Sequence, residues 1–502
     1  MKSLINGIIV TASLLAAGSV HAQGIDAAIQ AYNADNYNDA AYLFFDVSRN
    51  AQDPDNRYKA EFYLAQALYR GGYYLPAFQF YGEVFNQGEE HPYFLRATEG
   101  LLRVAEALDD TLIVPTVIDR GYTGSFNQLE AEDLNAINYM IALLSNRRAD
   151  YGTAAAFFEA ITDKNSPYYK KAQYHLAIIK VRAAIQNQTG DYSEAIAVFD
   201  QLQNDLRDSV DPADKKLYRL ATLGKARAYY SQGEFEQSIL SYENVTRFSE
   251  DWYDALYESG WAYFQAAQFG RALGSVHSVH SPYFDDRFRP ESFVLKATTY
   301  FQQCHFDRVR KTLDDFFASH QPMADQLKAW EESRPSNQDV VRLLENGSEN
   351  FPNQVRLRVL ENDKFRSYLG ILQQADKEIE TAKTEFPDGT FKGILVSLLE
   401  DQKNQWLELT GRLGQSLIAR HKGALDDFLN QAGFIQFETS DAERKMLEAG
   451  KDITKGPRAK GPRPYVPNNT FQFWAFNEEY WIDELGYYEH SIKDECIPEV
   501  FQ

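Results

Sequence analysis

Cysteine and basic side chains are scarce in this chain, and each scarcity excludes a class of protein. Two cysteines, Cys304 and Cys496, cannot build the disulfide framework of a small secreted scaffold, and no cysteine pair has the spacing of a zinc site. Lys and Arg number 51 against 72 Asp and Glu, which gives a formal net charge of −21. A chain this acidic is poorly suited to binding nucleic acid or an anionic membrane surface.

Long apolar runs are missing beyond the first residues. Lys2 precedes an uncharged run that ends in "VHA" at residues 20–22, and this run is too short and too rich in small residues to span a membrane well. The pattern is that of a secretory signal peptide, so residues 1–22 are predicted to be cleaved after Ala22. No cysteine lies near that site, so a lipoprotein is not expected. The sequence therefore predicts a periplasmic protein, with an uncleaved N-terminal anchor helix as the alternative.

Motifs that carry chemistry are also missing from the sequence. There is no G-x-S-x-G, no H-E-x-x-H and no glycine-rich phosphate loop. His277 and His280 could share a metal with a third ligand, but ordinary positions on a helix face are the simpler interpretation. Glu489, His490, Asp494 and Cys496 stand close together without matching any known ligand spacing. We therefore predict no catalytic residue, no metal and no cofactor.

What the sequence does contain is an internal repeat. In each copy an aromatic residue follows a polar or glycine-containing turn, a small or apolar residue comes three positions later, and a large one four further on. These steps place all three on one helical face, and the small residue lets two helices approach closely. The first two positions are Tyr37 and Ala40, Tyr74 and Ala77, Tyr151 and Ala154, Tyr192 and Ala195, Phe235 and Ser238, Phe269 and Ala272, and Phe306 and Val309.

The repeat resembles the tetratricopeptide repeat (TPR), a helix–turn–helix unit of about 34 residues. The step from Ser238 to Ala272 has this length, and the fullest match is Gly260, Tyr263, Phe269 and Ala272. The leading tryptophan is mostly absent, and Val309 replaces the usual alanine. The resemblance implies an all-α, right-handed solenoid of helical pairs over residues 23–322, with a surface that binds peptides or other helices. Proline at positions 54, 92, 167, 282 and 322 is expected to stop the second helices.

The pattern changes after Pro322. Residues 323–354 are predicted to be an irregular bridge with one short helix. Residues 355–449 carry two apolar stripes separated by "PDG" at 387–389, which predicts a long helical hairpin of the coiled-coil type. Gly411, Gly414 and Gly423 are expected to weaken its second helix. The capping-box pattern at residues 440–443 predicts the start of a separate, shorter helix.

The last part, residues 450–502, is predicted to be a basic, proline-rich tether followed by an aromatic docking segment. We expect the segment either to bind a partner or to fold back onto the hairpin or the last repeat, and fold-back is favoured because exposed aromatics promote aggregation. Helical spacing predicts a short helix capped by Asn477. A Cys304–Cys496 disulfide would accompany fold-back, and two free thiols are the alternative. The candidate docking residues are Phe473, Trp474, Phe476, Tyr480, Trp481, Tyr487 and Tyr488.

The ending "NEEYWIDELGYY" with a cysteine soon after also resembles exported repeat proteins of Tol/Ton-like or gliding-motility machines in bacterial envelopes. That resemblance implies an accessory subunit beside a proton-driven complex. We predict a non-enzymatic protein–protein interaction scaffold that binds other envelope proteins or peptides. The alternatives are a peptidoglycan-related enzyme or its regulatory subunit, and a polysaccharide-binding protein whose Trp474 and Trp481 are solvent-facing and coplanar.

Overall fold

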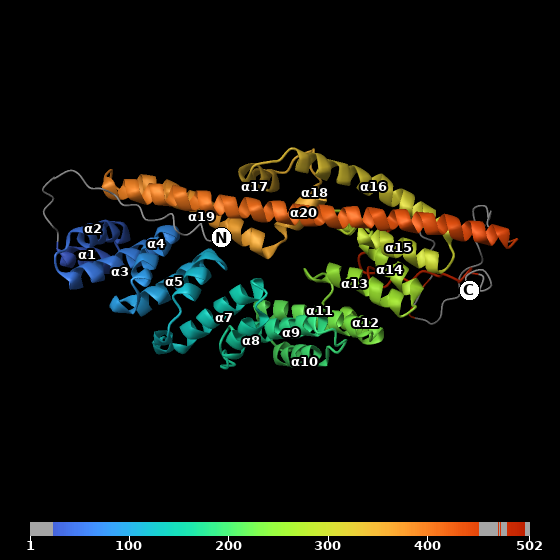
Figure 1. Ribbon diagram of the computed structural model, residues 1–502, viewed down its shortest axis with the longest axis horizontal. Helices are drawn as coiled ribbons and strands as arrows, with labels where there is room; N and C mark the ends of the chain where they lie inside the picture. The colour runs from blue at the N-terminus through green and yellow to red at the C-terminus, as the bar shows by residue number, and fades with distance from the viewer. Residues whose placement is uncertain (1–23, 451–469, 471, 473–478, 497–502) are drawn as a thin grey trace. The chain divides into compact units, whose positions relative to one another are not determined.

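The structure is a computed structural model that describes residues 24–450, 470, 472 and 479–496. The predicted signal peptide, most of the basic tether, and Phe473, Trp474 and Phe476 lie outside the described residues. Within them all regular secondary structure is helical, so the all-α prediction is confirmed (Figure 1). No helix in this part of the chain is both long and apolar enough to cross a membrane.

The helices follow one another with short connections, and consecutive helices pack against each other as pairs. Their bounds are α1 (Ile25–Asn33), α2 (Tyr37–Asn50), α3 (Pro54–Arg70), α4 (Tyr74–Asn86), α5 (Phe94–Leu108), α6 (Ile113–Arg120), α7 (Ala131–Arg147), α8 (Tyr151–Glu159), α9 (Tyr169–Gln186), α10 (Ser193–Leu206), α11 (Pro212–Gln232), α12 (Phe235–Glu243), α13 (Trp252–Gln265), α14 (Phe269–Val279), α15 (Glu291–Gln302), α16 (Phe306–Glu332), α17 (Asn337–Asn346), α18 (Asn353–Leu360), α19 (Asp363–Glu385) and α20 (Thr390–Glu448).

The chain forms two compact units. Unit 1 comprises the described residues up to 107, residues 121–125 and residues 377–400; unit 2 comprises residues 108–120, 126–376 and the described residues from 401 onward. The small residue of each repeat is buried in its own unit, with at most 1% of its surface exposed from Ala40 and Ala77 to Val309. The repeated position is therefore an interior position in each copy, as its place on the apolar helix face predicts.

In unit 1 a side chain of α19 completes the start of a repeat helix. Glu378, on α19 and 2% exposed, accepts hydrogen bonds from the backbone N–H groups of Tyr74 and Leu75 at 3.0 and 3.1 Å. These donors belong to the first turn of α4, where backbone N–H groups have no partner within the helix. A buried carboxylate at this position satisfies both donors and interacts favourably with the helix dipole.

Replacing Glu378 by alanine is expected to destabilise unit 1 by about 2 to 4 kcal/mol, because two buried N–H groups lose their acceptor. Amide exchange at Tyr74 and Leu75 in the full-length protein should accelerate accordingly. Glu385→Ala is the matched control on the same helix, because Glu385 is exposed and its side chain accepts a hydrogen bond from Asn38 at the surface, at 2.8 Å. Equal effects of the two substitutions would contradict this role of Glu378.

Two boundaries predicted around residue 322 are wrong. Helix α16 continues through Pro322 to Glu332, and its last turns together with α17 and the start of α18 occupy most of residues 323–354, which were predicted to be an irregular bridge with one short helix. A proline inside a helix costs about 3 kcal/mol, but Ala324 and Leu327 beyond it are buried in the core that α16 shares with α17 and α18. Burial of this apolar face therefore outweighs the local cost of the proline.

The second helix of the hairpin is also more regular than predicted. Helix α20 is continuous over 59 residues, and no new helix begins at residue 440. Gly411 does not interrupt it; a Cβ atom there would lie 2.4 Å from the side chain of Asn337, and one at Gly414 would lie 2.9 Å from Val340. These glycines let α17 approach α20 closely, so they serve packing and not flexibility.

Candidate functional site

The C-terminal segment of residues 479–496, red in Figure 1, folds back within unit 2 onto α13, α14 and the end of α15. It is not the predicted helix: its described residues form turns at 482–487 and have no regular secondary structure from 488 to 496. Gly486 has φ +86° and its N–H donates to the Ser278 hydroxyl at 2.9 Å, so this donor is used on α14 and not within a helix. The bonds to α14 therefore replace those of the predicted helix.

Leu485 is the apolar anchor of the segment. Its side chain is 1% exposed and packs with Trp252, Leu256 and Val279, residues of α13 and α14. A fully buried leucine stabilises such a contact by about 2 kcal/mol. Trp481, Ile482 and Tyr487 of the same segment are 50–58% exposed, so the segment has one inner and one outer side.

Two glycines on α14 create the space in which the segment lies. Gly270 and Gly274 are one helical turn apart, and the backbone N–H of His490 donates to the Gly270 carbonyl at 3.0 Å. A Cβ atom at Gly274 would lie 1.7 Å from the carbonyl oxygen of Tyr488, and one at Gly270 would lie 2.5 Å from that of His490. No other residue type fits at Gly274 while the segment is docked. We call the surface formed by Gly270, Gly274 and Ser278 the α14 groove.

A histidine of α14 is held between aromatic rings of the segment. His277 stacks on Tyr480 at a centroid distance of 4.7 Å and meets Tyr488 edge-on at 4.8 Å, with His490 6.2 Å away. Burial, with the charge of Lys296, lowers the pKa of His277 to about 4. Burial, together with neighbouring cationic groups, lowers the pKa of His490 to about 4 as well. Both imidazoles are therefore neutral at physiological pH, and His277 serves as a flat packing surface.

The metal alternative for the two closely spaced histidines is not supported by their surroundings. The His280 Nε2 atom lies 2.7 Å from the Ser292 hydroxyl, whereas His277 faces the tyrosines of the segment. In the part of the chain that the structure describes, no group of three or more His, Cys, Asp or Glu side chains is arranged to hold a metal ion.

The far end of the segment is fixed to the turn between α15 and α16. Cys496 forms a disulfide bond with Cys304, with a Cα–Cα distance of 5.0 Å. Beside it, the Glu495 N–H donates to the Gln303 carbonyl at 3.1 Å, and the His305 imidazole lies 2.7 Å from the Lys493 carbonyl. The sequence left pairing and free thiols open for the two cysteines, and the structure has the pair.

Arg247 holds the turn of the segment from the other side. Its guanidinium donates to the carbonyls of Asp483 and Leu485 at 2.8 and 3.0 Å and lies 4.4 Å from the centre of the Tyr487 ring. It also lies 5.0 Å from the ring of Phe248, which is 57% exposed and has φ +61°. A bulky residue at positive φ is uncommon. The exposed rings of Phe248 and Tyr487 thus both lie close to the Arg247 guanidinium.

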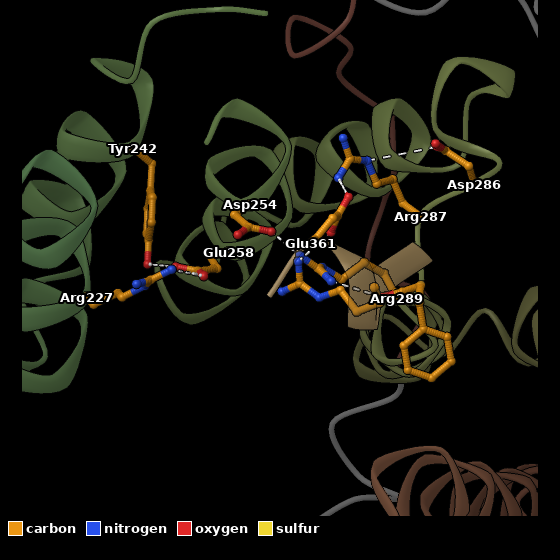
Figure 2. A network of polar contacts seen from close by, with 10 residues as sticks. Arg227, Tyr242, Asp254, Glu258, Asp286, Arg287, Arg289 and Glu361 are labelled. Atoms are coloured by element: carbon orange, nitrogen blue, oxygen red, sulfur yellow. Dashed lines mark hydrogen bonds and ion pairs between the residues drawn. The ribbon is translucent and has the colours of Figure 1, made fainter. Parts of the chain in front are cut away.

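A network of ion pairs joins the neighbouring repeats next to this site (Figure 2). Arg227 of α11 makes two bonds of 2.7 Å to Glu258 of α13, and Tyr242 of α12 donates to the same carboxylate at 3.0 Å. Arg289 pairs with Asp254, and Arg287 pairs with Glu361. Since each of these carboxylates is bound to an arginine, the network connects helices and leaves no acid poised for proton transfer.

A hollow of about 360 Å³ bears on the enzyme alternative. It is lined by Asp285, Asp286 and Ser319, among others, and the Ser319 hydroxyl lies 2.8 Å from His320 Nδ1. The same hydroxyl lies 2.7 Å from the Asp315 carbonyl, a contact that serines within helices commonly make. Burial lowers the pKa of His320 to about 4, which makes its imidazole a weak base.

The structure brings four of the seven candidate docking residues to this site and adds others that the sequence analysis missed. Tyr480 and Tyr488 lie on the inner side, and Trp481 and Tyr487 are half-exposed. The missed residues are Gly270, Gly274, Arg247 and Leu485. A pair of glycines one turn apart within an amphipathic helix was the available signal for the groove.

No protein-family model matches the chain, and no curated protein matches it either.

Proposed function

We propose that this protein is an exported, non-enzymatic scaffold of a bacterial envelope, built as a right-handed, TPR-like solenoid that binds segments of other proteins. The observation that carries the proposal is the docked segment itself. Helices α13–α15 hold eighteen residues without regular secondary structure through one buried leucine, two tyrosines and several backbone hydrogen bonds. This is how a surface binds a peptide: backbone bonds supply affinity and a few pockets supply selectivity.

The outer side of the site supports a role for the segment in binding a partner. Phe248, Trp481, Ile482 and Tyr487 are each 50–58% exposed and lie on or beside the docked segment. Large exposed apolar side chains that gather in one place are typical of protein interaction surfaces. The resemblance of the chain ending to Tol/Ton-like or gliding-motility accessory proteins suggests an energised envelope complex as the partner.

Photo-cross-linking in cells tests the proposal. A benzophenone amino acid at position 487 is expected to form a discrete cross-linked product with another envelope protein. The same amino acid at Val210, which is 85% exposed and belongs to the turn before α11, is the matched control and should give none. Absence of any product from positions 248, 481 and 487 would overturn the proposed function.

A further inference from the structure

Backbone groups of the docked segment make many of its polar contacts. The N–H groups of Gly486, His490 and Glu495 donate to the rest of unit 2, and the carbonyls of Asp483, Leu485 and Lys493 accept from it. Any polypeptide carries these backbone groups. Their partners are the side chains of Arg247, Ser278 and His305 and the carbonyls of Gly270 and Gln303, so another segment could make the same bonds.

The floor of the groove is the solenoid helix α14. Gly274 lies in the interior of this helix, where glycine is about 1 kcal/mol less favourable than alanine. The three atoms nearest to its Cβ position all belong to the segment: the carbonyl carbon and oxygen of Tyr488 and the Cα atom of Glu489. The helix thus carries a glycine where a side chain would collide with the docked backbone.

The segment that occupies the α14 groove is acidic. Residues 479–496 contain six acids and one lysine: Glu479, Asp483, Glu484, Glu489, Asp494 and Glu495 against Lys493. The solenoid side of the site instead offers cations, although the chain as a whole is acidic. Arg247 binds two carbonyls of the segment, and the charges of Lys296 and Arg308 act on His490. The segment that occupies the groove is thus acidic, and an external ligand is expected to share this charge.

We propose that the α14 groove is a peptide-binding site, and that residues 480–493 occupy it as an exchangeable internal ligand. The external ligand is an extended, acidic segment of a partner protein with an aliphatic residue, then glycine, then an aromatic residue two positions on, as in Leu485, Gly486 and Tyr488. The aliphatic side chain fills the pocket of Trp252 and Leu256, and the glycine is needed for the positive φ. On exchange, the displaced segment stays attached through Cys496 while its outer aromatics move with it. This inference rests on the proposed scaffold function and names its site and ligand class.

Binding of a synthetic peptide in trans tests the exchange. The probe is a fluorescein-labelled peptide of residues 479–495, and the protein is the full-length chain carrying Leu485→Asp, which removes the internal anchor and keeps the disulfide. Saturable binding is expected to the variant chain, with affinity at least tenfold higher than to the unaltered chain, whose own segment competes at high effective concentration. A peptide that itself carries Leu485→Asp should not bind.

Glycine variants test whether the peptide binds in the α14 groove. Adding Gly274→Ala to the L485D chain should weaken peptide binding at least tenfold, while Gly433→Ala should leave it unchanged, because a Cβ atom at Gly433 of α20 meets nothing within 4 Å. The proposal is overturned if the peptide does not bind, if G274A and G433A act alike, or if L485D alone abolishes the helical circular dichroism of the chain. The last result would make the segment a fixed part of the fold. If the peptide binds but positions 248, 481 and 487 all give no cross-linked product, the scaffold function is refuted while the peptide-binding groove is supported.

Discussion

Replacing Cys496 by serine is expected to lower the free energy of unfolding of unit 2 by about 5 kcal/mol. The disulfide with Cys304 joins residues 192 positions apart. A cross-link over so long a loop removes a large amount of conformational entropy from the unfolded chain, and the chain-entropy relation gives about 5 kcal/mol for this length. That loss is comparable to the whole stability of many domains. Denaturant unfolding of the full-length protein, oxidised and unaltered against Cys496→Ser, measures it.

The double variant is the control for this result. Cys304→Ser with Cys496→Ser should be about as stable as Cys496→Ser alone, because both variants lack the same bond and the effects of coupled residues do not add. In both variants the amides of Tyr74 and Leu75 in unit 1, which donate to Glu378, should stay protected from hydrogen exchange. A difference below about 1 kcal/mol between the oxidised protein and Cys496→Ser would show that the disulfide adds little to unit 2.

Mild acid is expected to unfold unit 2 above pH 4. Burial lowers the pKa of His280 to about 3, with nearby cationic groups adding to the effect. Burial likewise lowers to about 4 the pKa values of five further histidines: His175, His277, His320, His421 and His490. In the unfolded chain such side chains bind a proton near pH 6.5. Unit 2 therefore contains six imidazoles that are neutral when folded and charged when unfolded in mildly acidic solution.

The sign of the effect follows from proton linkage. Between pH 6.5 and 4 the unfolded state binds more protons than the folded state, so the free energy of unfolding falls as the pH falls. The stabilisation is fully present above pH 6.5 and is lost by about pH 4. Each histidine contributes about 1.4 kcal/mol per pH unit in this window, and even half of the combined slope would exhaust a typical stability within two or three units.

Circular dichroism and tryptophan fluorescence of the full-length protein against pH measure the transition. His280→Gln should move the midpoint to lower pH, because glutamine can still bond to the Ser292 hydroxyl and does not take up a proton. A midpoint below pH 4, or one that His280→Gln leaves in place, would contradict the assignment of neutral buried histidines.

The repeat architecture could be predicted because each copy carries its own local signal. An aromatic residue and a small residue three positions apart, as in Phe269 and Ala272, define a helix face without reference to the rest of the chain. The pattern therefore located the second helices of the pairs, and Ala272 is completely buried. Local patterns of this kind can be recognised in a single sequence because they do not depend on distant contacts.

The errors arose where distant contacts decide the outcome. Pro322 was expected to end a helix, but the burial of Leu327 carries α16 past it. The segment around Leu485 was expected to be helical from its spacing, whereas its backbone donors bind α14. The spacing of Gly270 and Gly274 was the one local signal of the groove, and its meaning depended on a distant contact, because the residues that lie over Gly274 come more than 200 positions later.

Amide hydrogen exchange of the C-terminal segment tests the central claim most directly. If residues 479–496 are docked on the α14 groove, the amides of Gly486, His490 and Glu495, which donate to Ser278, Gly270 and Gln303, should exchange at least a hundredfold more slowly than in the free peptide. Gly274→Ala should abolish the protection of Gly486 and His490 while leaving α14 protected. Exchange of these three amides at free-peptide rates in the unaltered protein would contradict the account.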